Sequence, residues 1–147
     1  HSAAPKQSLG LSVMRLLGLM GLMGLMLVAM SAAHATDCTN WEDGPQQKMN
    51  YCSFLDYQAA DKVLNQVWGV VSGQVKSNDA EMPGELRGWS KALLKAQRAW
   101  ILYRDNHCES EGFKFRGGSM EPLIISGCKA RMTRQRTEEL KLLIEDG

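Results

Sequence analysis

The chain has 147 residues, of which 17 are basic and 16 are acidic, so its formal charge is +1 at pH 7. Two of the basic residues, Lys6 and Arg15, lie in the first 35 residues, which contain no acidic residue, and residues 36–147 therefore carry a formal charge of −1. A charge this small excludes a concentrated basic face for nucleic acid and gives no electrostatic basis for membrane attachment. Residues 36–147 are enough for one small domain with a modest core.

The first 35 residues have the form of a secretory signal peptide with an N-terminal extension. Two positive charges precede an uncharged apolar run at residues 16–30, and Ala33 and Ala35 occupy the two positions that a signal peptidase reads. The apolar run is shorter than the roughly 20 residues that span a bilayer, which disfavours a retained anchor. We predict cleavage after Ala35, leaving a periplasmic or secreted domain of residues 36–147 without a membrane anchor.

Residues from about Pro45 to Val75 predict one long amphipathic helix. Apolar residues recur there at steps of three and four, which places them along one stripe of a helix, and nothing alternates with the period of two expected of a strand. Turn-forming residues follow at Ser77-Asn78-Asp79 and at Pro83-Gly84. We therefore expect the first helix to stop near Lys76.

A second helix is expected to begin near Gly84 or Glu85 and to end at Cys108. Its large or apolar residues stand at alternating steps of three and four, the spacing of a helix that packs against other helices. Two long helices with a short connection favour an antiparallel hairpin. The residues that carry this spacing are Leu86, Trp89, Leu93, Ala96, Trp100 and Tyr103.

A third helix is expected after a loop. Three glycines punctuate the polar stretch at residues 109–119, which cannot continue the second helix. Pro122 suits the first turn of a helix capped by Ser119 or Glu121, and a partial apolar face continues to near Glu145. The sequence thus predicts an all-α fold: a small disulfide-linked bundle of three main helices with a long antiparallel helical hairpin.

Four cysteines, Cys38, Cys52, Cys108 and Cys128, lie in the predicted mature domain, and this even number favours two disulfides. Zinc is the competing interpretation, but no Cys-x-x-Cys pair is present and His107 is the only histidine after residue 35. Antiparallel packing brings Cys52 and Cys108 to the same end of the hairpin, so the preferred pairing is Cys52–Cys108 with Cys38–Cys128. Pairing Cys108 with Cys128 across the glycine-containing loop stays open.

Three blocks of the sequence resemble the LprI-type lysozyme-inhibitor domain, a family of exported bacterial domains. Ala60–Trp68 reads Ala-Asp-x-x-Leu-Asn-x-x-Trp, Ala96–Cys108 contains Ala-Gln-Arg-Ala-Trp and Tyr-Arg-Asp, and Gly117–Leu140 contains Gly-Gly-Ser and the fourth cysteine. Trp68 stands where tyrosine is commoner in such proteins. The resemblance covers nearly all of residues 36–147 and implies a small helical, disulfide-linked envelope domain that inhibits a host or competitor lysozyme.

The polar residues of these blocks are expected to form an internal network that fixes the register of the helices, because buried charges are tolerated only when paired. If Cys52 and Cys108 lie at one level, Arg104 lies near Asp56, and both aromatic side chains of the second block pack inward. The alternative is that the charged residues meet a ligand at the surface. The expected network comprises Asp61, Asn65, Gln97, Trp100, Tyr103, Arg104, Asp105, Thr133 and Arg136.

The stretch from Glu109 to Glu121 is the expected partner-binding loop. It combines acidic residues with two aromatic side chains, and cysteines hold both of its ends. A protein inhibitor of lysozyme needs a rigid protrusion that enters the substrate cleft and complements a basic enzyme surface. The alternative is that the aromatic side chains fold back onto the helix ends. The candidate residues are Glu109, Glu111, Phe113, Phe115, Ser119 and Glu121.

No catalytic constellation is visible in the sequence. It lacks a Gly-x-Ser-x-Gly motif, a histidine with a metal-ligand partner and a phosphate-binding glycine loop, so we expect no enzyme activity, no cofactor and no metal. The favoured function is binding and inhibition of a lysozyme or related peptidoglycan hydrolase. The alternative is a non-catalytic envelope adaptor, or an immunity protein, that binds another protein.

Overall fold

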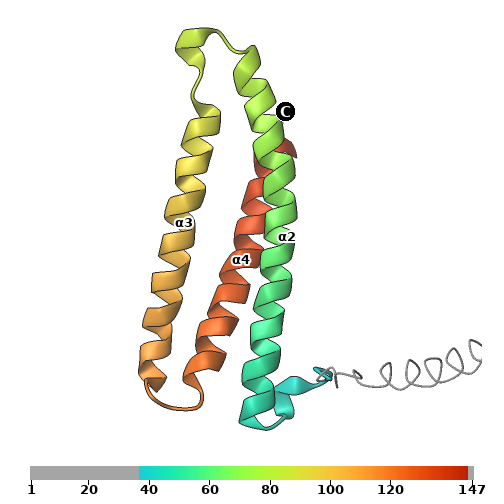
Figure 1. Cartoon of the computed structure of the whole chain (residues 1–147), viewed down its shortest axis with the longest axis vertical. Coiled ribbons are helices and arrows are strands. Elements are labelled where there is room, and N and C mark those ends of the chain that lie inside the picture. The colour runs from blue at the N-terminus through green and yellow to red at the C-terminus, as the bar shows by residue number, and fades with distance from the viewer. Residues whose placement is uncertain (1–36, 146–147) are drawn as a thin grey trace, which may run out of the picture. The chain divides into compact units, whose positions relative to one another are not determined.

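The computed structural model describes residues 37–145 and folds them into three long helices joined by short 3-10 turns (Figure 1). This part of the chain contains no strand, and none of its helices is both long and apolar enough to cross a membrane. The predicted all-α, disulfide-linked bundle of three main helices is confirmed. The predicted signal peptide, residues 1–35, lies outside the described residues.

The helices are α2 (Gln46–Glu81), α3 (Trp89–Gly112) and α4 (Glu121–Glu145), and the turns are η1 (Trp41–Asp43), η2 (Gly84–Leu86) and η3 (Phe113–Phe115).

Helices α2 and α3 form the antiparallel hairpin, and α4 runs beside α2 in the same direction as α2 (Figure 1). α4 packs against both other helices and most extensively against α2, whereas α2 and α3 touch each other least. α4 is therefore the central helix of the bundle. Helix α4 has 25 residues, whereas α2 has 36. Within the described residues, the connection between α2 and α3 therefore extends beyond the C-terminal end of α4 (Figure 1).

The apolar core lies in the half of the bundle nearer to the connection between α2 and α3. It consists of large side chains from all three helices, and each such side chain contributes about 1.5–3 kcal/mol when it is fully buried. Partly buried aromatic residues, Trp68 and Trp100, pack against it. The buried core residues are Leu64, Val71, Val75, Leu93 and Leu140.

In the other half of the bundle, α2 and α4 pack through small side chains. Ser53 and Ala60 on α2 and Ala130 and Thr133 on α4 are buried there. A Cβ atom added at Gly127 would lie only 3.8 Å from the Ser53 hydroxyl oxygen. Small residues allow the two helix backbones to approach closely, but they bury less apolar surface than the core does.

The structure pairs Cys38 with Cys52 and Cys108 with Cys128. The preferred pairing of Cys52 with Cys108 and Cys38 with Cys128 is therefore wrong, and the alternative bond between Cys108 and Cys128 is confirmed. The error came from treating α2 as the neighbour of α3. Because α4 is the central helix, the fully buried Cys108 faces α4, and its Cα atom lies 5.5 Å from that of Cys128.

Helix α2 continues to Glu81, so the predicted turn at Ser77-Asn78-Asp79 is wrong. The Asp79 carboxylate instead caps the start of α3: one oxygen accepts hydrogen bonds from the backbone N–H groups of Gly88 (2.8 Å) and Trp89 (3.0 Å), and the other accepts from Ser90 (3.3 Å). These bonds, that from Gly88 above all, lower the pKa of Asp79 below its ordinary value of 3.8. Asp79, a residue type that is common in turns, thus connects α2 to the start of α3 through hydrogen bonds.

Helix α3 begins later and ends later than predicted. It begins at Trp89, directly after Gly88, whose φ of 141° favours glycine. It continues past Cys108 to Gly112, because Gly112 packs against α4 instead of breaking the helix. A Cβ atom there would lie 2.6 Å from Cγ1 of Ile125. The loop that joins α3 to α4 is therefore shorter than the sequence indicated.

We predict that Asp79→Asn lowers the melting temperature at pH 6, because asparagine lacks the charge that the three N–H groups favour. The folded pKa of Asp79 is depressed, so its contribution is complete well above pH 3.8 and is lost as the pH falls through the folded value. The deficit of the variant should therefore shrink between pH 6 and pH 3 in thermal unfolding. Asp43→Asn, at an exposed aspartate, is the control. An equal deficit at both pH values would contradict this assignment.

We also predict that Gly112→Ala lowers the free energy of unfolding by about 1–3 kcal/mol, because the new methyl group overlaps Ile125. Gly69→Ala is the matched control in a helix interior. Nothing lies within 4 Å of a Cβ atom at Gly69, so this change should raise the free energy of unfolding by about 0.5–1 kcal/mol. Urea denaturation measures both. Stabilisation by Gly112→Ala would show that α3 and α4 do not meet there.

Candidate functional site

The side chain of Arg104 on α3 lies between the three helices, and the residue is only 5% exposed. Its Nη1 donates to Oδ1 of Asp61 on α2 and to Oγ1 of Thr133 on α4, each at 3.1 Å. Its Nε donates to Oδ1 of Asp105 at 3.0 Å. One guanidinium therefore joins all three helices in the half of the bundle where α2 and α4 pack through small side chains.

Two aromatic rings complete the surroundings of Arg104. The guanidinium carbon lies 5.2 Å from the ring centre of Tyr57 and 5.1 Å from that of Trp100, within the range of cation–π attraction. Burial lowers the pKa of Arg104, but the hydrogen bond to Asp105 and the nearby negative charges outweigh it, so the pKa is raised and the side chain stays charged. Burial raises the pKa of Tyr57, and the charge of Arg104 opposes this rise.

Other members of the expected network lie around this centre. Asn65 donates to the second oxygen of Asp61 at 3.0 Å, although Asn65 itself is exposed. Asp105 also lies 3.3 Å from Nζ of Lys129, a residue outside the expected network. Arg136 donates from Nε to Oε1 of the buried Gln97 at 3.0 Å and forms a separate pair between α4 and α3. The structure thus brings the expected polar residues into one connected set and one neighbouring pair.

Tyr103 does not join this set. It is 58% exposed, and its ring stacks on His107 with 5.4 Å between centroids. The prediction that both aromatic residues pack inward is therefore wrong for Tyr103, because Trp100 and Arg104 already occupy the inward positions of that turn. Arg104 forms its ion pair across to α2 with Asp61, whereas Asp56 pairs with Arg134 of α4.

Sequence analysis missed Tyr57 and Lys129. Each lies four residues before a network member, Asp61 or Thr133 respectively, and therefore on the same helix face. This spacing was the signal that could have identified them.

The expected partner-binding loop, Glu109–Glu121, is ordered by contacts within the chain. Its first residues, to Gly112, belong to α3, and η3 follows. Asn50 of α2 donates from Nδ2 to the Ser119 carbonyl at 2.9 Å, which ties the loop to the start of the bundle. Phe113 is 56% exposed, and Phe115 is partly buried.

All three glutamates of this loop lie close to an arginine. Glu111 accepts from Arg131 at 3.0 Å, and Glu121 lies 3.3 Å from Arg116. Arg116 is also 3.7 Å from Glu109. A second oxygen of Glu121 accepts from the N–H of Gly117 at 2.7 Å, where φ is 76°. The acidic groups therefore hold the loop in shape, and its negative charge is compensated locally.

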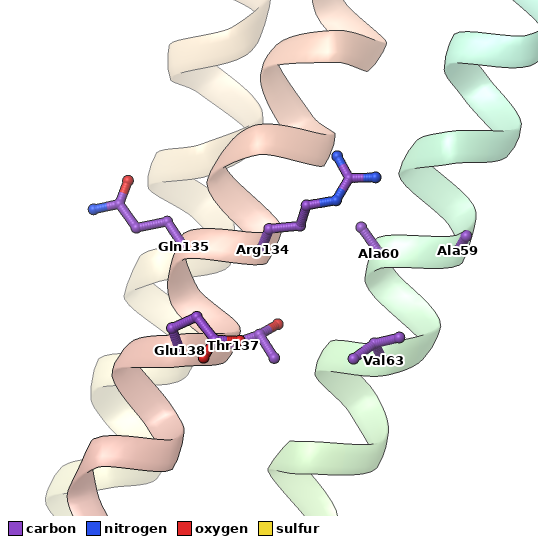
Figure 2. A pocket seen from close by; sticks show the side chains of 7 residues that line it. All are labelled: Ala59, Ala60, Val63, Arg134, Gln135, Thr137 and Glu138. Atoms are coloured by element: carbon purple, nitrogen blue, oxygen red, sulfur yellow. The ribbon is translucent and has the colours of Figure 1, made fainter.

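A pocket of about 480 Å³ opens between α2 and α4. Figure 2 shows Arg134 and Thr137 extending from α4 toward small side chains on α2. Its charged groups are engaged, since Arg134 pairs with Asp56 and Glu138 pairs with Lys141. No nucleophile with a neighbouring base lines it, so this pocket has no catalytic arrangement. Its lining is Ala59, Ala60, Val63, Arg134, Gln135, Thr137 and Glu138.

One cluster within residues 37–145 has potential metal ligands, because donor atoms of His107, Glu111 and Cys128 lie within 4.8 Å of one another. The sulfur of Cys128 is bonded to that of Cys108 and offers no thiolate. His107 Nε2 lies 2.9 Å from Glu111, an ion pair when the imidazole is protonated. This cluster does not form a metal site.

Comparison with known proteins identifies the family. The family model described as "Lysozyme inhibitor LprI" matches residues 38–140, a stretch that includes all four cysteines and the whole set around Arg104. The chain belongs to the LprI family. LprI is a family of inhibitors, which fits a protein without catalytic activity, and the family and the two disulfides fit an extracytoplasmic protein.

A bacterial relative is also similar over about two thirds of the chain. The "Uncharacterized protein R02472" of Rhizobium meliloti (strain 1021) is 49% identical over 104 residues, which cover 68% of this chain and 74% of that protein. Its name states no activity. No solved structure matches the chain.

We predict that Arg104→Lys lowers the free energy of unfolding by about 1–3 kcal/mol, because an ammonium group cannot reach all three helices as the planar guanidinium does. Arg98→Lys is the matched control, since Arg98 is exposed on the same helix. Its effect should stay below about 0.5 kcal/mol. Equal stability of the two variants in urea denaturation would show that Arg104 does not determine the packing.

Proposed function

We propose that the protein binds and inhibits a lysozyme or a related peptidoglycan hydrolase in the bacterial envelope. The observation that carries this proposal is the LprI match, which extends over the helical bundle from the first cysteine to Leu140. Fold alone does not carry activity, but this match also includes the polar residues around Arg104.

The rigidity of the bundle supports this function. An inhibitor that competes with substrate loses affinity when it must become ordered on binding. Here, two disulfides and the contacts of Arg104 order the helices before any partner arrives. The domain therefore suits binding as a preformed body.

The proposed setting is the periplasm or the exterior of the cell, reached after cleavage behind Ala35. In that compartment both disulfides can form and persist. The loop Glu109–Glu121 is one candidate contact with the hydrolase, because it exposes Phe113 beside Arg116, whose guanidinium carbon lies 4.5 Å from the ring centre.

We predict that the oxidised protein slows lysis of bacterial cell walls by at least one lysozyme from a panel of chicken-type, goose-type and invertebrate-type enzymes. Turbidity of a cell-wall suspension measures the rate, and heat-denatured, reduced and alkylated protein at equal concentration is the control. Unchanged lysis by all three types at excess protein contradicts the proposal. In that case, a pull-down from an envelope extract tests the alternative of an adaptor or immunity protein.

A further inference from the structure

The connection between α2 and α3, from Asp79 to Ser90, forms a protruding end that we call the hairpin tip. It lies at the opposite end of the bundle from the loop between α3 and α4, and it extends past α4 (Figure 1). It exposes three large apolar side chains, of which Leu86 is the most accessible at 61%. The other two are Met82 and Trp89. Apolar residues gathered at a protruding end are typical of a contact with another molecule.

The backbone of the hairpin tip is fixed by side chains within it. Arg87 donates from Nε to the carbonyl of Met82 at 2.8 Å and from Nη2 to the carbonyl of Ala80 at 2.9 Å. On the other side, Asp79 accepts the three N–H groups at the start of α3. The N–H of Leu86 donates to the carbonyl of Pro83 at 2.9 Å. The tip is thus ordered without a partner, which reduces the entropy lost on binding.

The hairpin tip carries a net charge of −2, from Asp79, Glu81 and Glu85 against Arg87. Its one cation is engaged with backbone carbonyls. Glu81 and Glu85 form no ion pair within the part of the chain that the structure describes. Along the chain, the next positive residues on either side of the tip are Lys76 on α2 and Lys91 on α3.

The loop at the opposite end differs in this respect, because each of its glutamates lies within 3.7 Å of an arginine. Exposed charges act over about 8 Å at physiological ionic strength. Carboxylates that form no ion pair, beside exposed apolar side chains, therefore make the hairpin tip the better complement to a cationic protein with an apolar-lined cleft.

We propose that the hairpin tip is the part of this protein that enters the substrate cleft of the inhibited lysozyme. Leu86 is the anchor within the cleft, and Glu81 and Glu85 face its basic rim. This inference rests on the proposed function, because it names the surface through which inhibition occurs. The partner is accordingly a cationic glycoside hydrolase with an open saccharide-binding cleft.

The test compares variants at the two ends of the bundle in the oxidised protein. Leu86→Ala and Glu85→Lys alter the tip, and each should raise the inhibition constant by about tenfold or more, as removal of an interface anchor does. Leu142→Ala on α4, where the leucine is 58% exposed, is the matched control, and Phe113→Ala tests the loop at the other end. Leu142→Ala should leave inhibition within about twofold of wild type, and Phe113→Ala should raise the inhibition constant less than either tip variant does. Thermal unfolding of all four variants checks that the fold is unchanged.

A second measurement examines the cleft itself. A soluble chitooligosaccharide that occupies the cleft should weaken binding of the protein to the lysozyme in proportion to its occupancy. Binding unaffected by the saccharide overturns the inference, as does wild-type inhibition by both tip variants. A loss of inhibition confined to Phe113→Ala overturns it in favour of the opposite loop. Failure of the wild-type protein to inhibit any lysozyme is a different result and overturns the proposed function as well.

Discussion

The contacts of one buried guanidinium determine how the three helices meet in half of this bundle. The large apolar side chains lie toward the hairpin connection, while the other half is packed through serine, alanine and threonine. In that half, Arg104 makes up for the smaller buried apolar surface, because it donates hydrogen bonds to both α2 and α4 and faces two aromatic rings. Its burial is tolerated because Asp61 and Asp105 pair with it and both stay in contact with solvent. The paired charge of Arg104 thus stabilises the contact of three helices in a half of the bundle where few large apolar side chains are buried.

Helical periodicity predicted the number, order and approximate extent of the helices, because the apolar stripes follow the helix repeat over many turns. It could not predict their ends. Asp79 and Gly112 are residues that usually end helices, yet here Asp79 caps a different helix and Gly112 permits close contact with α4. Both effects depend on a neighbouring segment far along the chain. Local sequence signals therefore identified special positions but not what those positions do.

The candidate site was predictable to a similar degree. Motif residues such as Asp61, Arg104 and Thr133 were recognised from the family resemblance, and they meet in space. Tyr103 belongs to the same motif but faces outward, because a helix presents only some of its residues to its neighbours. The hairpin tip was interpreted only as a turn. Its exposed apolar groups and uncompensated charge become visible only when the end of α4 and the ion pairs are known.

The arrangement of the disulfides has a consequence for how the protein matures. Each cysteine is bonded to its nearest cysteine along the chain, with separations of 14 and 20 residues. Closing a loop costs about 0.6 kcal/mol more for each doubling of its length, so the native bonds are favoured over a bond from Cys52 to Cys108, 56 residues apart. Joining the cysteines in chain order, each to the next one, yields the native pairs directly. The native connectivity is thus the one in which no bond has to be rearranged after sequential pairing along the chain.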